Sequence, residues 1–320
     1  QPVFFCVCSQ KGGVGKSTFT ILLASWLHYA LGRDVLVVDC DAPQWSIVAQ
    51  RERELDVLER NDRYKLMMVR LFKRTGRKIW PVVRSTPEEG LQAAHAYLAA
   101  GDREADFVLL DLPGTVAAPG IFRLLARLDH LFIPLKADKL VLESALSFAR
   151  AVDEQLVHND ALRLTGLHLF WTMVDRRERT PLYESYGKAF AAFRLPVLQT
   201  QVPYRSRFSK EILDTSGAVG RSTLFPAELS PPMPRSTRWP QKFCLLWNSV
   251  WSDAMTRQST KRRCGRLSAV SRRTAPCSAL GKIRRQTMNR LRHRKPLHPK
   301  RASRAVGACV CLITSKPSCV

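Results

Sequence analysis

The fold is decided by one stretch of the sequence, Gln10-Lys11-Gly12-Gly13-Val14-Gly15-Lys16-Ser17-Thr18. It follows the apolar run 3–8, which is typical of a buried strand, and it precedes a segment, 19–30, whose apolar residues have helical spacing. A glycine-rich turn between a buried strand and the start of a helix is the context that a phosphate-binding loop needs. The sequence therefore predicts a strand, a phosphate-binding loop and a helix, in that order.

The residue types in this loop suit the binding of phosphate. Glycines let the backbone curl until several N–H groups point at one spot, and the helix start adds the positive end of its dipole. The side chain of Lys16 can reach the β- and γ-phosphates, and the Ser17 hydroxyl can bind Mg²⁺. We expect the phosphates to be held by Gly12, Gly13, Val14, Gly15, Lys16, Ser17 and Thr18.

The string Lys-Gly-Gly-Val-Gly-Lys-Ser-Thr, 11–18, resembles the deviant Walker A motif of the ParA/MinD family of P-loop ATPases. Gln10 stands where the plain Walker A motif has its first glycine, and Lys11 adds a second lysine ahead of the glycines. The alternative is a glycine-rich turn that arose by chance, and the match of the whole string between a strand and a helix argues against it. The resemblance implies an ATPase whose cofactors are ATP and Mg²⁺.

Three aspartates follow two further buried runs. The runs 35–39 and 107–111 are apolar up to their last residues, Asp39 and Asp111, and Asp41 follows the first run closely. Asp111 fits a Walker B role, in which it holds Mg²⁺ through water. The resemblance implies that Asp39 supports the water shell of the metal and that Asp41 orients the attacking water. For an aspartate at a strand end, helix capping and turn formation are the alternatives.

Lys11 needs a separate explanation, because a lysine ahead of the glycines cannot easily reach the γ-phosphate held by its own loop. In the resembled family this lysine crosses a dimer interface to the nucleotide of the partner and acts like an arginine finger supplied in trans. The resemblance therefore implies a homodimer that assembles on ATP, with Lys11, Lys16 and Asp41 as its catalytic residues. A solvated lysine is the alternative.

Recognition of the base is expected near two late segments. The Asn-Lys-x-Asp string with which GTPases commonly read guanine is absent from the sequence. Thr172 stands where the resembled family often has an Asn near the adenine, and the string 201–204, which includes Pro203, resembles the second loop on the adenine side. The resemblance thus implies ATP, with Thr172 and Pro203 among the residues that bind it.

Apolar strands alternate with helical segments from the start of the chain to residue 226. This pattern predicts an α/β fold of the P-loop NTPase class, a mostly parallel sheet with helices on both faces. Ligands of such sheets bind at the carboxyl ends of the strands, where the motif residues lie. Expected strands are 3–8, 35–39, 79–83, 107–111, 130–135, 166–174 and 197–198, and expected helices are 19–30, 46–74 (with an apolar stripe of Leu55, Leu58, Leu66 and Val69), 87–101, 121–128, 142–156, 182–193 and 207–213.

The chain changes character after residue 226, so we expect a ParA-like domain at 1–226 and a separate tail at 227–320. The formal net charge of the chain is +24, and most of it lies in the tail, which has 21 Lys and Arg but only two acidic residues. The tail also contains six of the nine Cys. One interpretation is a disordered basic arm that grips nucleic acid. The other is a frame-shifted product, which the Cys and Trp content favours because disordered arms usually avoid both residues.

Cysteine spacing and hydropathy indicate the redox environment of the domain and whether it spans a membrane. Cys6, Cys8 and Cys40 lie in or beside predicted buried strands, without the spacing of a metal site or of a disulfide. This favours a reducing, cytoplasmic location. No apolar run approaches the length of a membrane span, so we expect no membrane association, and we expect a few residues to be missing before Gln1.

Further strings resemble the TraA-type ParA proteins of Bacteroides conjugative transposons, namely 38–41, 111–115, 142–144, 173–175 and 221–226. The resemblance implies a role in partition or transfer of a mobile DNA element and a partner protein that stimulates hydrolysis. It also implies non-specific DNA binding through basic residues near the end of the domain, here Arg205, Arg207 and Lys210. The alternative is that these three residues form a solvated helix face that binds no DNA.

Three other protein classes were weighed. A MinD-like membrane positioner needs an amphipathic C-terminal helix, which the tail lacks. An iron-protein-like reductase needs two well-placed cysteines, and Cys6, Cys8 and Cys40 lie in the wrong elements. A nucleotide-gated DNA- or protein-binding module with little or no turnover is the serious alternative, against which the presence of both Asp41 and Asp111 argues.

Overall fold

The computed structural model describes residues 1–101, 104–114, 119–175, 177, 180–199, 201–212 and 219–227. They all belong to one compact unit, Gln1–Arg257. The expected tail, 227–320, lies outside the described residues except for Ala227.

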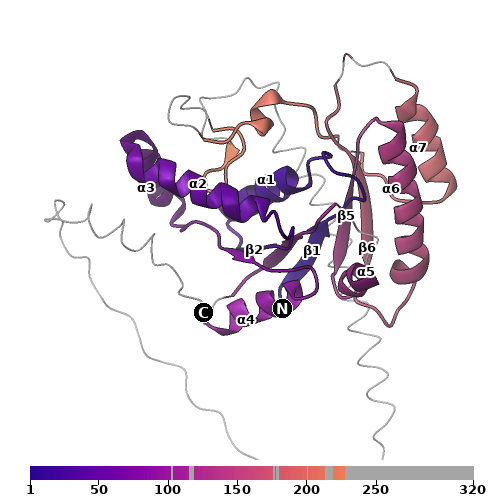
Figure 1. The fold of residues 1–320 in the computed structure, drawn as a ribbon, viewed down its shortest axis with the longest axis horizontal. Helices are drawn as coiled ribbons and strands as arrows, with labels where there is room; N and C mark the ends of the chain where they lie inside the picture. Colours follow the sequence, from indigo (N-terminus) through magenta and orange to yellow (C-terminus); the bar gives the residue numbers. More distant parts are fainter. Residues whose placement is uncertain are drawn as a thin grey trace, which may run out of the picture. The chain divides into compact units, whose positions relative to one another are not determined.

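A six-stranded sheet forms the centre of this unit, with the strand order β3-β2-β4-β1-β5-β6 and every neighbouring pair parallel (Figure 1). The strands are β1 (Val3–Val7), β2 (Val35–Asp39), β3 (Val82–Arg84), β4 (Phe107–Asp111), β5 (His130–Leu135) and β6 (Gly166–Trp171). A parallel sheet needs a crossover between consecutive strands, and helices supply these crossovers here. The predicted fold class is confirmed.

The helices between the strands are α1 (Lys16–Tyr29), α2 (Ser46–Arg60), α3 (Asp62–Thr75), α4 (Gly90–Ala99), α5 (Pro119–Leu125), α6 (Lys139–Val152) and α7 (Leu182–Ala192). A π-helical turn, η1 (Asp153–Val157), continues α6, and a 3₁₀ turn, η2 (Ser206–Ser209), follows the sheet in sequence. Among the described helices, none combines the length and apolar character that crossing a bilayer requires.

The two faces of the sheet bury alternate residues of each strand. Along β1, Phe5 and Val7 pack in a cluster with α1 residues such as Leu23, whereas Phe4 and Cys6 pack in a cluster that includes residues of α4, α5 and α6. Because both faces are covered, each of β1, β2, β4 and β5 is buried along its whole length. This explains why these strands appear in the sequence as continuous apolar runs.

The register of the sheet aligns the strand ends that carry the motif residues. Val7, the last residue of β1, pairs with Asp111 of β4, and Asp111 pairs with Asp39 of β2. The phosphate-loop string begins three residues after Val7, at Gln10. The carboxyl edge of the sheet therefore brings the loop and the two aspartates together.

Several expected bounds were wrong. The segment 46–74 is two helices separated at Asn61, whose backbone is extended (φ −120°). The side chain of Asn61 caps α3 by accepting a hydrogen bond from Arg63 N. Leu66 and Val69 are exposed, because α3 packs through Tyr64, Met68 and Leu71.

Differences also occur at the ends of other elements. The helix expected at 87–101 begins at Gly90, strand 79–83 is shifted to β3, and strand 166–174 ends at Trp171. Strand 197–198 is reduced to an isolated bridge between Val197 and Leu169. The helix expected at 207–213 is only the turn η2, since 210–212 are not helical and residue 213 lies outside the described part of the chain.

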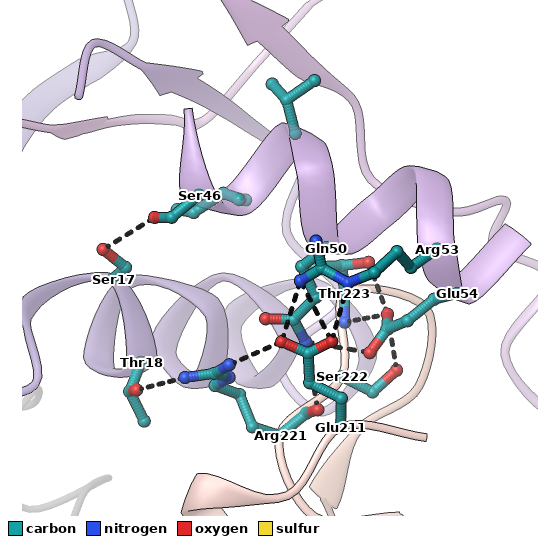
Figure 2. A network of polar contacts seen from close by, with 12 residues as sticks. Ser17, Thr18, Ser46, Gln50, Arg53, Glu54, Glu211, Arg221, Ser222 and Thr223 are labelled. Atoms are coloured by element: carbon teal, nitrogen blue, oxygen red, sulfur yellow. Dashed lines mark hydrogen bonds and ion pairs between the residues drawn. The ribbon is translucent and has the colours of Figure 1, made fainter. Parts of the chain in front are cut away.

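The segment 219–225 packs against α2 and α3, where Leu224 and Phe225 join Tyr64 and Leu71 in a third apolar cluster. A buried carboxylate, Glu54 of α2, fixes this segment in place (Figure 2). Its oxygens accept hydrogen bonds from Gln50 Nε2, Ser222 Oγ, Thr223 N and Thr223 Oγ1. Burial raises the pKa of Glu54, and these hydrogen bonds act in the opposite direction.

We expect Glu54→Ala to lower the free energy of unfolding by about 3 kcal/mol, because it leaves buried donors of the 219–225 segment without an acceptor. Glu52→Ala is the matched control, since Glu52 lies in the same helix and is exposed. It should change the value by less than about 0.5 kcal/mol. Chemical denaturation measures both, and an equal effect of the two variants would contradict a structural role for Glu54.

Candidate phosphate-binding site

The loop between β1 and α1 has the backbone of an anion site. Gly13 and Gly15 adopt left-handed conformations with φ of 74° and 86°, which residues with a Cβ rarely adopt. Gly15 is the N-cap of α1 and has no side chain with which to cap the helix. The first turn of α1 also lacks an acidic residue. Among the described residues, the N–H groups of Lys16, Ser17 and Thr18 have no hydrogen-bond acceptor, so an external anion such as a phosphate could accept from them.

Lys16, the first residue of α1, lies where the loop approaches the turn after β4. A Cβ on Gly114 would be 3.5 Å from Lys16 Nζ and 3.6 Å from Gly12 N. Burial raises the pKa of Asp111, and the nearby charge of Lys16 acts in the opposite direction. The ammonium group thus lies between the loop backbone and the carboxyl end of β4, as the phosphate-binding prediction requires.

Asp111 is fully buried and its Oδ2 atom has no hydrogen-bond partner among the described residues. Burial raises the pKa of Asp111 to about 7; a hydrogen bond with Ser17 opposes this rise, and the charge of Asp39 adds to it. Thr20 Oγ1 lies 3.5 Å from Oδ1. A buried carboxylate oxygen without a donor is the environment that a cation would stabilise.

The residues around Asp111 fit a Mg²⁺ ion. Ser17 offers a hydroxyl oxygen close to the Asp111 carboxylate, and Ser46 Oγ donates to Ser17 Oγ at 3.2 Å. The described residues contain no group of three or more His, Cys, Asp or Glu side chains that could hold a metal. A small number of protein ligands is sufficient for Mg²⁺, because this ion usually keeps several waters and binds phosphate oxygens of the substrate.

Asp39 has a capping role in the structure. Its Oδ1 accepts from Asp41 N at 3.2 Å, and its Oδ2 accepts from Ile47 N at 2.9 Å and from Val48 N at 3.0 Å. The carboxylate therefore caps the start of α2, which is the alternative that the sequence left open. Its role in the water shell of a metal stays a prediction.

Asp41 begins the loop that leads from β2 to α2. Its carbonyl oxygen accepts hydrogen bonds from Gln44 N and Trp45 N, both at 2.8 Å. The Trp45 indole donates to Ser85 O, and the guanidinium of Arg84 lies 3.4 Å from the centroid of the Trp45 ring. These contacts with β3 and the residue after it fix the far end of the loop, while Asp41 remains only half-buried at the carboxyl edge of the sheet.

Lys11 is exposed, whereas Val14 in the middle of the loop is buried. The backbone N–H of Lys11 donates to Ser9 Oγ at 3.3 Å. An exposed lysine at the rim of the loop is available to a second molecule, as the predicted function in trans requires.

The expected adenine-side residues lie beside each other. Thr172 follows β6 and is buried, and its N–H donates to Leu135 O at 2.8 Å. Pro203 pairs with Val174 in an isolated bridge. Met173 between them has a φ of 54°, and its Cε would be 3.3 Å from a Cβ on Gly15. The segments of Thr172 and Pro203 therefore meet next to the phosphate loop.

Sequence reasoning missed contacts that tie distant segments to the loop. Ser144 Oγ of α6 donates to Gln10 Oε1 at 2.8 Å. Arg221 Nη1 donates to Thr18 Oγ1 at 3.0 Å. Both Ser144 and Arg221 belong to strings that the sequence analysis singled out for their resemblance, which was the signal available for them.

The basic group near the end of the described chain is only partly described. Arg205 and Lys210 are exposed, and the side chain of Arg207 lies outside the described part. A cavity of about 270 Å³ is lined by Phe4, His95, Arg127 and Arg163, among others. Because Phe4 is near the amino end of β1, this cavity is separate from the phosphate loop.

Comparison with known proteins gives matches over the same region. The model of the CobQ/CobB/MinD/ParA nucleotide binding domain matches residues 5–217. The chromosome-partitioning ATPase Soj of Treponema pallidum is 30% identical over 230 residues, which covers 63% of this chain and 83% of that protein. Soj of Thermus thermophilus is 28% identical over 222 residues, which covers 58% of this chain and 86% of that protein.

Among solved structures, a putative plasmid partition protein from Borrelia burgdorferi bound to AMPPNP has a TM-score of 0.48 and 18% sequence identity, covering 78% of this chain and 100% of its own. The region matched by the family model includes the phosphate loop, the three aspartates, Thr172 and Pro203. Arg221 lies beyond it.

Proposed function

Because the chain belongs to the CobQ/CobB/MinD/ParA nucleotide-binding family, we propose that it binds ATP with Mg²⁺ and hydrolyses it. The observation that carries this proposal is the uncapped start of α1 beside the buried, unpartnered Oδ2 of Asp111. One feature suits phosphate oxygens, and the other suits the cation that accompanies them.

The residues divide the work of phosphoryl transfer, which depends on positioning and charge neutralisation. The N–H groups of the loop and the ammonium of Lys16 hold the phosphates. Ser17 and Asp111 hold Mg²⁺, which neutralises the charge on the phosphate oxygens when it is bound. Asp41, half-buried near the start of the loop from β2 to α2, orients the attacking water. Lys11 enters the site of a second subunit, so the active form is a homodimer assembled on ATP.

We expect Lys11→Ala to bind ATP like the wild type but to remain a monomer, because the exposed lysine acts on the nucleotide of the partner. Lys73→Ala, which removes another exposed lysine, is the control and should dimerise normally. Light scattering with and without ATP distinguishes the two. A Lys11→Ala variant that forms dimers as the wild type does would rule out the contribution in trans.

The cellular role that we propose is partition or transfer of a mobile DNA element. Two observations support it: relatives at 28% and 30% identity are chromosome-partitioning ATPases, and several strings resemble TraA-type ParA proteins. Non-specific DNA would bind through exposed cations such as Arg205 and Lys210, and a partner protein would stimulate hydrolysis. In this proposal the ATPase domain ends at residue 226, and 227–320 is a separate tail.

A nucleotide-gated binding module with little or no turnover is the second candidate. The capping of α2 by Asp39 favours it, since both oxygens of this carboxylate already accept backbone hydrogen bonds. Measuring phosphate release with and without DNA separates the two candidates. Release that DNA accelerates supports the ATPase, whereas tight ATP binding without release in either condition supports the module.

A further inference from the structure

An arginine from the end of the described chain contacts the phosphate loop. Arg221 lies 203 residues after Thr18 in the sequence, and Nη1 of its guanidinium donates to Thr18 Oγ1 at 3.0 Å (Figure 2). Thr18 is the third residue of α1 and the last of the phosphate-loop string. The contact therefore joins the segment 219–225 to the residue that completes the loop.

The donor and acceptor groups of Arg221 and Thr18 determine the direction of the hydrogen bond between them. A guanidinium has only donors, so Thr18 Oγ1 must accept from Arg221. The hydroxyl proton of Thr18 is then left to donate elsewhere. Phosphate oxygens only accept, so a nucleotide in the loop is a suitable acceptor for this proton.

Arg221 is held in place from several sides. Its Nη2 donates to Glu211 Oε1 at 2.9 Å, and Glu211 also binds Arg53 of α2. Its backbone N–H donates to Lys210 O at 2.9 Å, and its carbonyl oxygen accepts from Gln50 Nε2 at 3.2 Å. A side chain so constrained loses little further freedom when a ligand binds.

Arg221 also retains a free donor. Its Nε is buried and has no hydrogen-bond partner among the residues described. A buried donor without an acceptor is costly, so its presence beside the phosphate loop needs a reason. An anionic ligand nearby would offset this cost through the charge of the guanidinium.

We propose that Arg221 is a positioning residue of the nucleotide site, which fixes Thr18 so that its hydroxyl donates to a phosphate oxygen. The inference rests on the proposed binding of ATP and adds a residue from outside the region matched by the family model. Its consequence is that the segment 219–225, which Glu54 anchors to α2, forms part of the nucleotide site.

The test is a double-mutant cycle on the full chain, with the dissociation constant of Mg-ATP as the readout. Arg221→Gln and Thr18→Val should each weaken binding about tenfold, and the two together should weaken it by about the same factor. Arg60→Gln is the matched control, because Arg60 is an exposed arginine that pairs only weakly with Asp56 of the same helix, α2. It should leave the affinity within about twofold of the wild type.

Two results would overturn the proposal: wild-type affinity in Arg221→Gln, or a loss in the double variant equal to the product of the single losses. If Arg221→Gln does not fold, Thr18→Ser and Thr18→Val are compared with Arg221 intact. Thr18→Ser should keep the affinity and Thr18→Val should lose it, and equal affinities would contradict the role of the hydroxyl. Absence of ATP binding by the wild type would instead contradict the proposed function itself.

Discussion

Lys16→Ala should lower the affinity for Mg-ATP by at least about a hundredfold. The ammonium of Lys16 lies between the loop backbone and the end of β4, close to Gly12 and Gly114. In the proposed function Lys16 binds the terminal phosphates, and hydrogen bonds from a charged donor are about twice as strong as neutral ones. Titration calorimetry with Mg-ATP measures the loss.

Lys139→Ala is the control for this variant. Lys139 is also the first residue of a helix, α6, but it is exposed and its neighbour in charge is Glu143 of the same helix. Its replacement should leave the affinity unchanged. If Lys16→Ala kept the affinity of the wild type, the assignment of the phosphate loop would be wrong.

Asp41→Ala should bind ATP and form the dimer, yet hydrolyse ATP at least about a hundredfold more slowly. The carboxylate is half-buried near the start of the loop from β2 to α2, and it belongs neither to the phosphate loop nor to the pair Ser17 and Asp111 that we propose for Mg²⁺. The variant should therefore accumulate as an ATP-bound dimer. Phosphate release measures turnover, and light scattering follows the dimer.

Asp56→Ala serves as the control, because Asp56 is an exposed acid of α2. It should turn over ATP at the wild-type rate. Normal turnover by Asp41→Ala would show that another residue orients the water, and loss of ATP binding would show that Asp41 holds the nucleotide instead.

The fold and the centre of the site could be predicted because their signals are local. A strand buried on both faces produces a continuous apolar run, and the runs that end at Val7, Asp39 and Asp111 are such strands. The left-handed backbone at Gly13 and Gly15 explains why glycine is needed there. Strand pairing then places the aspartates side by side at the same edge.

Other features could not be predicted because they depend on packing between distant segments. Leu66 and Val69 are exposed because α3 packs through Tyr64, Met68 and Leu71, which cluster with Leu224 and Phe225 of the segment 219–225. Glu54 has no feature in the sequence that distinguishes it from other charged helix residues, yet its carboxylate is buried and accepts a hydrogen bond from Thr223 N.

The contact of Arg221 with Thr18 and the absence of an α-helix at 207–212 could not be predicted either. Arg221 reaches Thr18 across 203 residues, and no local pattern indicates a contact of that kind. The helix expected at 207–213 fails for a related reason: Glu211 pairs with Arg53 of α2 and with Arg221, and residues 210–212 are not helical. Arg221 N–H also donates to the carbonyl oxygen of Lys210.

The central claim is that the uncapped start of α1 and Asp111 together form a site for a nucleotide and its cation. The most direct test is the affinity of the full chain for ATP, measured by calorimetry with Mg²⁺ and again after chelation of the metal. We predict binding that weakens clearly when Mg²⁺ is removed. Absence of binding to adenine nucleotides in the presence of Mg²⁺ would contradict the claim.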